Sequence, residues 1–483
     1  MKTTIPSPKL TELLSGTLTE EEALEIYDQG KDAVVWALLS LQKRVDELSR
    51  VNATGEAMPS SPSSTIPPYL KPQSKRKAKR SGARPGHVGH RRSTPEPDEV
   101  VDLTLPCCPE CGGEVTKCRS SKSTRTRIVE DISPAPKVKI TQYDIHGYWC
   151  SHCGKVVEPK VTAALPSNRI GNRTIALTAW LHYGLGNTIA QILDVLNYHL
   201  SITVTSGGLL HLWNRAAEIL APWYEEIRTS CLESGVLHAD ESGWRVDGQT
   251  EWLWCFATPK ETYYLIHPTR SEQALNEFFK DYFDGVLVSD FYAAYNSVEC
   301  LASQKCLVHL LRELEKIELY KDTSDNWNKF KSQLKRLIRD SIKLKSAKAD
   351  LVPEDFERKR SRLFKRLDEL LDFTSDNEEV VRLVKRLDKY RDHILTFLDY
   401  DDVPPDNNLA ERSIRPAVLM RKTQFGNRSE SGAETQAILM SVFRSLKQRG
   451  INPSDAVRVA LCQYALSETI PSLNDVVNLI EAE

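Results

Sequence analysis

Short apolar runs separated by turn signals dominate residues 236 to 308, and their length and spacing are typical of β-strands. The elements predicted there, in chain order, are strands at 236–240, 251–258 and 262–267, a helix at 274–282, a strand at 285–289, a turn or helix at 292–298 and a strand at 305–308. Asp247 and Gly248 form the Asp-Gly signal of a tight hairpin between the first two strands. We therefore expect three antiparallel strands, a helix and two further strands.

Three acidic residues stand out because of where they fall relative to these elements. Asp240 and Asp290 end strand-like runs, and Glu411 lies in a polar, arginine-flanked segment predicted to be helical. Carboxylates gathered from separate elements can hold two Mg²⁺ (or Mn²⁺) ions about 3.5–4 Å apart, as in nucleases that cut phosphodiesters. The chain has 66 Asp and Glu residues, so chance triplets are common and the prediction depends on the surrounding order of elements.

The predicted order is that of a ribonuclease-H-like core, with acids on the first strand, just after the fourth strand and on a later helix. The separation between Asp290 and Glu411 is too long for such a core alone and predicts an insertion at about residues 320–402. Its sequence is helical in pattern and heavily charged with alternating signs. A solvated helical hairpin and a basic face that holds flanking or hairpin DNA are both open. The fold class is multidomain α+β, with a ribonuclease-H-like α/β catalytic core.

The chain resembles DDE transposases of insertion sequence family sixty-six over most of residues 233 to 450. The matching segments are H-A-D-E-S-G-W-R-V-D-G, W-L-W-C-F-A-T, L-V-S-D-F-Y-A-A-Y-N, K-C-L-V-H-L-L-R-E-L, D-N-N-L-A-E-R-S-I-R-P and R-K-T-Q-F-G-N-R-S-E-S-G-A. The resemblance implies that Asp240, Asp290 and Glu411 are catalytic metal ligands and that two Mg²⁺ (or Mn²⁺) ions are the cofactor. It implies DNA as partner, both transposon terminal inverted repeats and target DNA, and suggests accessory proteins of the same element.

The activity implied by this resemblance is that of a magnesium-dependent polynucleotidyl transferase. Cleavage of the transposon strand would leave a 3′-hydroxyl, which would then attack target DNA at the same site. A serine or tyrosine recombinase would need a covalent nucleophile, and no neighbouring sequence singles one out. Two alternatives remain open: a domesticated, non-catalytic regulator that contains zinc and binds DNA, and a structure-specific ribonuclease-H-like nuclease that cuts without joining.

Positive residues around the second and third acids are candidates for DNA contacts. They are Arg412, Arg415, Arg421, Lys422, Arg428, His309 and Arg312. Guanidinium groups can clamp phosphates in a bidentate manner, with pairing to nearby acids or helix capping as the alternative. A buried structural role is the alternative for His309. Tyr292 and Tyr295 can either stack on an unpaired base or pack in the core.

Composition indicates several domains, because 483 residues with 40% hydrophobic content exceed what a single core usually holds. The formal net charge of −2 conceals a basic tract over residues 71–92 that contains no acid. Its DNA-binding candidates are Lys75, Arg76, Lys77, Lys79 and Arg80. Such a tract would bind phosphates in a salt-sensitive, sequence-independent way, even if its Ser, Pro and Gly content leaves it a disordered linker.

Four of the eleven cysteines have the spacing of zinc ligands. Cys108 and Cys111 form one C-x-x-C knuckle and Cys150 and Cys153 form a second, each followed by glycine. Four thiolates favour tetrahedral Zn²⁺ with no open position, so we expect structural zinc; unligated buried cysteines are the alternative. In the resembling family this domain contributes to recognition of the DNA ends.

The segment before the basic tract has apolar residues at heptad spacing, at Val34, Leu38, Leu41, Val45 and Leu48. This predicts a short coiled coil and hence a homodimer or larger assembly on DNA, with a helix packed on its own chain as the alternative. The sequence shows neither a secretory signal nor an apolar run of membrane-spanning length, so we expect a cytoplasmic, nucleoid-associated protein without membrane contact.

Residues 188–200 and the stretch after residue 205 predict two helices, which fit either a DNA-binding helix-turn-helix or plain helical packing. The predicted domains are a helical or coiled-coil segment at 1–52, a basic linker at 53–101, a zinc-binding domain at 102–162, a helical DNA-binding region at 163–232, a catalytic domain at 233–450 with the insertion at 320–402, and a helical tail at 451–483.

Overall fold

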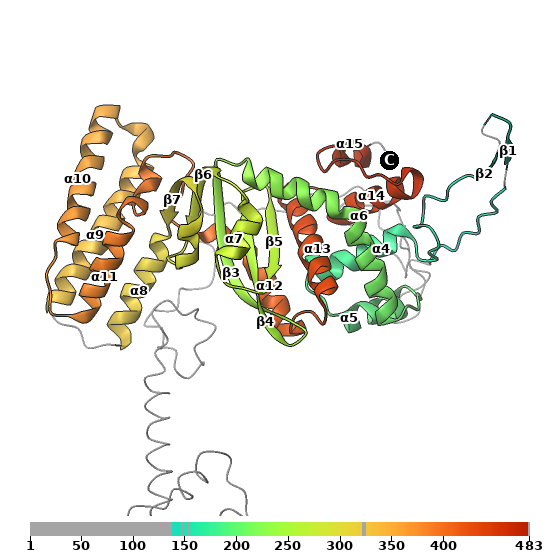
Figure 1. Cartoon of the computed structure of the whole chain (residues 1–483), viewed down its shortest axis with the longest axis horizontal. Helices are drawn as coiled ribbons and strands as arrows, with labels where there is room; N and C mark the ends of the chain where they lie inside the picture. Colours follow the sequence, from blue (N-terminus) through green and yellow to red (C-terminus); the bar gives the residue numbers. More distant parts are fainter. Residues whose placement is uncertain (1–137, 147, 153–154, 321–324, 482–483) are drawn as a thin grey trace, which may run out of the picture. The chain divides into compact units, whose positions relative to one another are not determined.

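The computed structural model of the chain describes residues 138–146, 148–152, 155–320 and 325–481 (Figure 1). Its described residues divide into two compact units, one formed by residues 222–451 and one by residues 138–221 together with 452–481. The predicted coiled coil at 1–52 and the basic linker at 53–101 lie outside the described residues. Within the described part, no helix carries an apolar stretch sufficient to cross a bilayer.

A five-stranded mixed sheet organises the unit at 222–451. Its strands are β3 (Val236–Val246), β4 (Gln249–Ala257), β5 (Thr262–His267), β6 (Phe283–Ser289) and β7 (Cys300–Lys305). Their order across the sheet is β5-β4-β3-β6-β7. The first three strands pair antiparallel, whereas β6 lies parallel to both β3 and β7. The predicted antiparallel trio and the predicted fourth strand are confirmed.

The hairpin between β3 and β4 is also confirmed. Asp247 and Gly248 both have positive φ, 47° and 75°, which a two-residue turn of this hand requires. The hairpin tip is tied to a distant loop, since Asp247 N–H donates to the Asn427 carbonyl at 2.9 Å and Asn427 N–H donates to the Arg245 carbonyl at 2.9 Å. Gly426, with φ of 111°, lies so close to the Arg245 carbonyl that a Cβ there would be 2.2 Å from its oxygen.

The fifth predicted strand, at 305–308, is wrong in its position. The strand β7 ends at Lys305, and α8 (Leu307–Tyr320) begins two residues later. The apolar run at 306–308 looked like a strand, but Leu307 starts a helical series with Leu310, Leu314 and Ile317, all at most 2% exposed. Helical spacing over the longer window therefore decides the local structure.

Helices cover the sheet and its edge. The helix α7 (Glu272–Phe279) lies between β5 and β6, as predicted, while α12 (Asn408–Gln424) packs on β3 and β4, and α13 (Glu430–Gln448) packs on β5. The edge strand β5 is closed by α13, because Thr262 N–H and Tyr264 N–H donate to the hydroxyls of Ser445 and Ser441 at 3.0 and 2.9 Å. These bonds replace the missing neighbouring strand.

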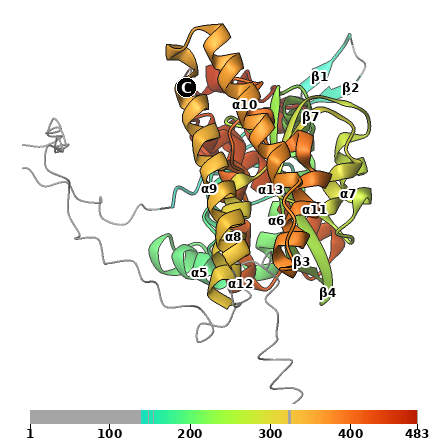
Figure 2. The same cartoon turned by 90° about the vertical axis from the view of Figure 1, so that its left-hand side faces the viewer.

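The predicted insertion is helical. It comprises α9 (Asp325–Ser346), α10 (Pro353–Leu371) and α11 (Glu378–Lys389), which run alongside one another with α8 (Figures 1 and 2). Their apolar faces share one core with Val286 and Val288 of β6, so the insertion is continuous with the sheet. Glu313 of α8 is held by Arg382 and Arg386 of α11, which fixes the two helices to each other.

The unit at 138–221 and 452–481 is mainly helical, as predicted for residues 170–230. Its elements are β1 (Tyr148–Cys150), β2 (Lys155–Val157), α4 (Asn172–Ala179), the π-helix η3 (Trp180–Gly184), α5 (Ile189–Asp194), the π-helix η4 (Val195–His199), the start of α6 (Ser206–Leu232), α14 (Pro453–Ser467) and α15 (Val476–Glu481). Trp213 is completely buried and stacks on His182, while its indole N–H donates to Thr178 at 3.1 Å. The two helices predicted around residues 188–213 are therefore present, and Trp213 serves packing.

Candidate active site

Two of the predicted acids lie side by side at one end of the central parallel pair. His238 of β3 is in register with Val288 of β6, and Asp240 and Asp290 each follow two residues later. Equal even offsets keep both side chains on the same face of neighbouring strands, which are about 4.8 Å apart. Each carboxylate is held by a nearby backbone amide. Asp240 Oδ1 accepts from Glu241 N–H at 3.0 Å, and Asp290 Oδ1 accepts from Tyr292 N–H at 2.8 Å.

The third acid, Glu411, lies on α12, whose N-terminal end is hydrogen-bonded to β3. Asn407 donates through Nδ2 to the Ala239 carbonyl at 2.7 Å, and its Oδ1 accepts from His238 Nδ1 at 3.0 Å. Its backbone N–H also donates to Cys306 Sγ at 3.2 Å. Glu411 follows one helical turn later, its N–H donating to the Asn407 carbonyl at 3.1 Å.

These three carboxylates share one electrostatic environment. The pKa of Asp240 is raised well above its usual value, first by burial and then by the negative charges of Glu241, Asp290 and Glu411. A pKa raised in this way means that the folded protein disfavours the ionised form of Asp240. The charges of Asp290 and Glu411 therefore act on Asp240. Among the described residues, the group whose ligand atoms lie within 4.8 Å of one another combines Glu411 with Cys306 and His309, not with the two aspartates.

A fourth acid, Glu241, was not predicted. Its side chain is only 2% exposed and pairs with the Arg270 guanidinium, whose Nε lies 3.0 Å from Oε1. Tyr295, itself 1% exposed, donates its hydroxyl to the other oxygen. Burial and then Asp290 raise the pKa of Glu241. Tyr295 is therefore a core residue that supports the acids. In the sequence, the signal for this network was the position of Glu241, a charged residue directly after Asp240.

Arg270 is clamped between two aromatic rings. Its guanidinium carbon lies 4.7 Å from the Trp252 ring centroid and 4.0 Å from the Tyr292 ring centroid. Tyr292 also donates its hydroxyl to the Arg270 carbonyl. The sequence left Tyr292 open between stacking on a base and packing in the core. In the structure its ring contacts the Arg270 cation.

A buried lysine balances part of this negative charge. Lys305, at the end of β7, is 1% exposed. Its Nζ donates at 3.0 Å to the hydroxyl of Ser289, the residue directly before Asp290. Burial lowers the pKa of Lys305 to about 8, while Asp290 opposes that shift. A lysine that ends a strand gave no sequence signal of its own, because its partners come from β6.

Two residues that the sequence selected as DNA contacts meet Glu411. Arg312 Nη1 lies 3.3 Å from each carboxylate oxygen, and His309 Nδ1 lies 3.6 Å from Oε1. Cys306, which is buried, joins them: one ligand atom each of Cys306, His309 and Glu411 lies within 4.8 Å of the others. Such a thiol, imidazole and carboxylate set can hold a metal ion. Burial raises the pKa of the Cys306 thiol to about 11.

The cations after Glu411 separate into two groups. Arg421 donates to Ser242 Oγ at 3.1 Å and to the Gly243 carbonyl, so it holds α12 against β3. The remaining candidates have exposed side chains; they are Arg412, Arg415, Lys422 and Arg428. These four are available to a ligand.

Other predicted site residues fall outside this description. Lys75, Arg76, Lys77, Lys79 and Arg80 of the basic tract, and Cys108, Cys111 and Cys153 of the zinc site, lie outside the described residues. Cys150 ends β1, which pairs antiparallel with β2 through Cys150 and Lys155. Zinc binding stays a prediction.

Replacing Asn407 by Ala is expected to impair the site without touching an acid. The change leaves His238 Nδ1 and the Ala239 carbonyl without their partner, which costs about 1–3 kcal/mol of folding free energy. Because the first turn of α12 then loses its anchor, we expect DNA cleavage to fall ~10–100-fold, with a higher Mg²⁺ concentration needed for half-maximal rate. Asn408→Ala is the matched control. An unchanged Mg²⁺ requirement would contradict this role of Asn407.

Comparison with known proteins identifies the family of the chain. The transposase IS66 family matches residues 168–435, more than half of the chain and the whole span that carries the acids. The chain belongs to this family. It is also 23% identical over 237 residues to the uncharacterized protein y4qI of Sinorhizobium fredii, a match covering 44% of each chain. The chain thus spans less than half the length of that relative.

Proposed function

We propose that this protein is a DDE transposase that cleaves DNA at transposon ends and transfers the strand into target DNA. The observation that carries the proposal is the register of Asp240 and Asp290 at the ends of two neighbouring strands, with Glu411 on a third element. Burial raises the pKa of Asp240 most, followed by the negative charges of Glu241, Asp290 and Glu411. The strand order β5-β4-β3-β6-β7, with two acids on its adjacent central strands, supports a ribonuclease-H-like core.

The donor set fits divalent magnesium or manganese. Asp240, Asp290 and Glu411 would hold the ions, since hard cations prefer carboxylate oxygens. Burial and mutual repulsion leave Asp240 poorly stabilised as an anion, a condition that a cation relieves. When bound, the ions would supply Lewis-acid stabilisation of the attacking and leaving oxygens.

The chain's own residues then bind and orient the DNA. Arg412 and Arg415 are exposed within the turn after Glu411 and are suited to hold phosphates on either side of the scissile bond. Arg312 and His309 fix the Glu411 carboxylate until the site is loaded. Arg270 and Lys305 are nearby cations that offset part of the repulsion between the acids in the folded protein.

The reaction proceeds by two in-line displacements. Water attacks the phosphorus at the transposon end, a P–O bond forms, and the bond to the 3′-oxygen breaks to give a 3′-hydroxyl and a 5′-phosphate. That hydroxyl next attacks a target phosphodiester, forming a new P–O bond and releasing a target 3′-hydroxyl. Neither step needs a covalent bond to the protein.

The remaining parts of the proposal concern DNA recognition. The segment at 102–162 would bind structural Zn²⁺ through Cys108, Cys111, Cys150 and Cys153 and contribute to end recognition. The basic tract would add salt-sensitive affinity for phosphates. The heptad pattern at the N-terminus would support a homodimer or larger assembly on DNA, with accessory proteins of the same element as further partners.

A strand-transfer assay tests the proposed function. Purified protein is incubated with Mg²⁺, labelled duplexes carrying the element's own terminal repeats and a plasmid target. We expect a nick that leaves a 3′-hydroxyl, followed by labelled DNA joined to the plasmid. Cleavage without joining would instead indicate a structure-specific nuclease, and binding without cleavage would indicate a regulator; either result contradicts the proposal.

A further inference from the structure

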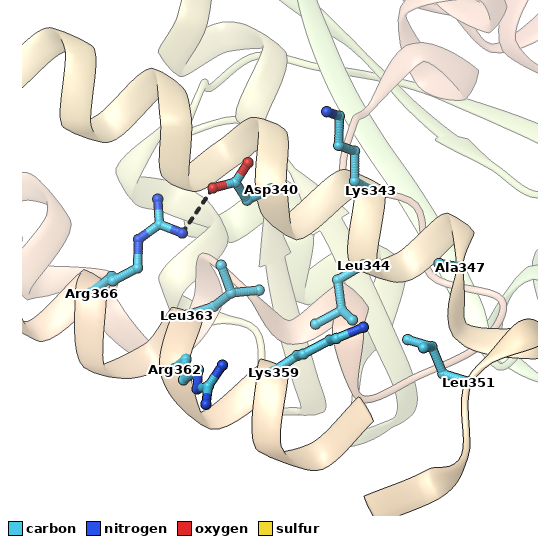
Figure 3. A pocket seen from close by; sticks show the side chains of 9 residues that line it. All are labelled: Asp340, Lys343, Leu344, Ala347, Leu351, Lys359, Arg362, Leu363 and Arg366. Atoms are coloured by element: carbon cyan, nitrogen blue, oxygen red, sulfur yellow. Dashed lines mark hydrogen bonds and ion pairs between the residues drawn. The ribbon is translucent and has the colours of Figure 1, made fainter. Parts of the chain in front are cut away.

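The insertion contains a pocket of about 350 Å³ between α9 and α10 (Figure 3). We call it the α9–α10 groove and define it by Lys343 and Leu344 of α9 and by Lys359, Arg362, Leu363 and Arg366 of α10. Leu344 and Leu363 are 7% and 5% exposed and form its apolar floor. The four cations surround that floor.

Helical spacing explains why these cations gather. Lys359, Arg362 and Arg366 follow at intervals of three and four residues, so they lie along one stripe of α10. Lys343 of the neighbouring helix α9 also lines the groove, although its side chain extends away from α10 in Figure 3. Their long aliphatic stems can rest on the leucine floor while the charged ends remain in solvent.

Most of this positive charge is not neutralised by the chain. Asp340 is the acid that lines the groove, and it pairs with Arg366 at 2.9 Å and with Arg336 at 3.8 Å. Lys343, Lys359 and Arg362 have exposed side chains, and among the described residues none of these three forms an ion pair. Three uncompensated cations on a concave surface therefore favour an anionic ligand.

Hydrogen bonds connect the groove to the segment that precedes α12. Two residues beyond Lys343, Lys345 donates to the Phe397 carbonyl at 2.7 Å and to the Tyr400 carbonyl at 2.5 Å. The chain then runs to Pro405, whose carbonyl accepts from Leu307 N–H at 2.9 Å, and on to Asn407 at the start of α12. A ligand held in the groove is thus held by the same unit that carries the acids.

We propose that the α9–α10 groove binds the phosphodiester backbone of the DNA that is being cut, away from the scissile bond. This inference rests on the proposed function and adds a named DNA-binding surface to it. The guanidinium of Arg362 matches phosphate oxygens in a bidentate manner, and the two lysines supply point charges. Such contacts set affinity and position the duplex without reading its sequence.

The test compares salt dependence of DNA binding in the full-length protein. The groove variant combines Lys343→Gln, Lys359→Gln and Arg362→Gln. The matched control removes the same charge through Lys335→Gln, Lys365→Gln and Lys385→Gln, none of which lines the groove. Binding to a fluorescently labelled random-sequence duplex is measured by anisotropy over a series of salt concentrations without divalent metal, and circular dichroism verifies that both variants fold.

For the groove variant we expect the slope of log affinity against log salt to become shallower by about 1 per cation, or by ~3 in total, for every sequence tested. The control should retain the wild-type slope. Equal slopes for the groove variant and wild type, while wild type still cuts terminal-repeat DNA, would overturn the groove alone. A changed oligomeric state of the groove variant with an unchanged slope would assign the groove to a protein contact and also overturn it. A wild-type protein that binds no DNA would overturn the proposed function as well.

Discussion

Replacing Asp290 by Asn should abolish both DNA cleavage and strand transfer. The substitution keeps the size of the side chain and its Oδ1 acceptor for Tyr292 N–H, but removes the charge that would hold a divalent ion. Metal-ion stabilisation of transition-state charge is worth several kcal/mol, and each 1.36 kcal/mol is a factor of ten in rate. We therefore expect a loss on the order of 10³-fold or more in product formed per unit time, measured with labelled terminal-repeat DNA.

The matched control for this experiment is Asp284→Asn. Asp284 lies near the start of β6, the strand that Asp290 directly follows, and its side chain is exposed. It should cut DNA at the wild-type rate. Cleavage by the Asp290 variant within a few-fold of wild type would show that the reaction does not depend on this carboxylate.

Replacing Asp240 by Asn should stabilise the metal-free protein, and the gain should increase with pH. Burial and the neighbouring acids raise the pKa of Asp240 above its unfolded value of about 3.9. Between the two pKa values the folded state holds a proton that the unfolded state has lost, so wild-type stability falls as pH rises through that window, by up to about 1.4 kcal/mol per pH unit. Asparagine does not titrate and removes this fall.

The measurement is chemical denaturation in EDTA between about pH 5 and pH 7, taken as the difference between variant and wild type. The difference cancels groups common to both proteins, such as His238, whose pKa is lowered by burial and whose contribution to stability rises with pH. Lys305, with a pKa of about 8, stays largely charged in this range. A difference in unfolding free energy between variant and wild type that stays constant with pH would contradict the raised pKa of Asp240.

Added Mg²⁺ should reverse the order of stability at neutral pH. A ligand that binds only the folded state stabilises it by about 2.7 kcal/mol at a hundred times its dissociation constant. Wild type should gain this stability on titration with Mg²⁺, whereas Asp240→Asn should gain little, because one ligand is missing. Equal gains for the two proteins would place the ion elsewhere.

Much of the catalytic unit could be predicted from local sequence. Alternating apolar residues predicted the antiparallel strands. The pair Asp247-Gly248 predicted the hairpin, because only residues that tolerate positive φ form that turn. Asp240 and Asp290 could be found because each ends an apolar run. Glu411 could be found because it lies in the polar, arginine-flanked segment D-N-N-L-A-E-R-S-I-R-P, which matches the resembling family. In each case the information lies within a few residues of the position.

The supporting residues could not be predicted, because their partners are remote in sequence. Glu241 depends on Arg270 and Tyr295, and the role of Asn407 depends on the backbone of β3, more than 160 residues earlier. The strand expected at 305–308 failed for a related reason: three apolar residues are compatible with either structure, and only the helical spacing that continues to Ile317 decides. Remote contacts therefore determine the roles of Glu241 and Asn407, whereas a longer window of the same sequence would have been enough to predict the helix that begins at Leu307.

Crystals grown with Mn²⁺ and a terminal-repeat duplex would test the central claim most directly, by locating the ions from their anomalous scattering. We predict ions coordinated by the carboxylates of Asp240, Asp290 and Glu411 beside the scissile phosphate. Manganese bound instead by Cys306, His309 and Glu411, with Asp240 and Asp290 free of metal, would contradict the account.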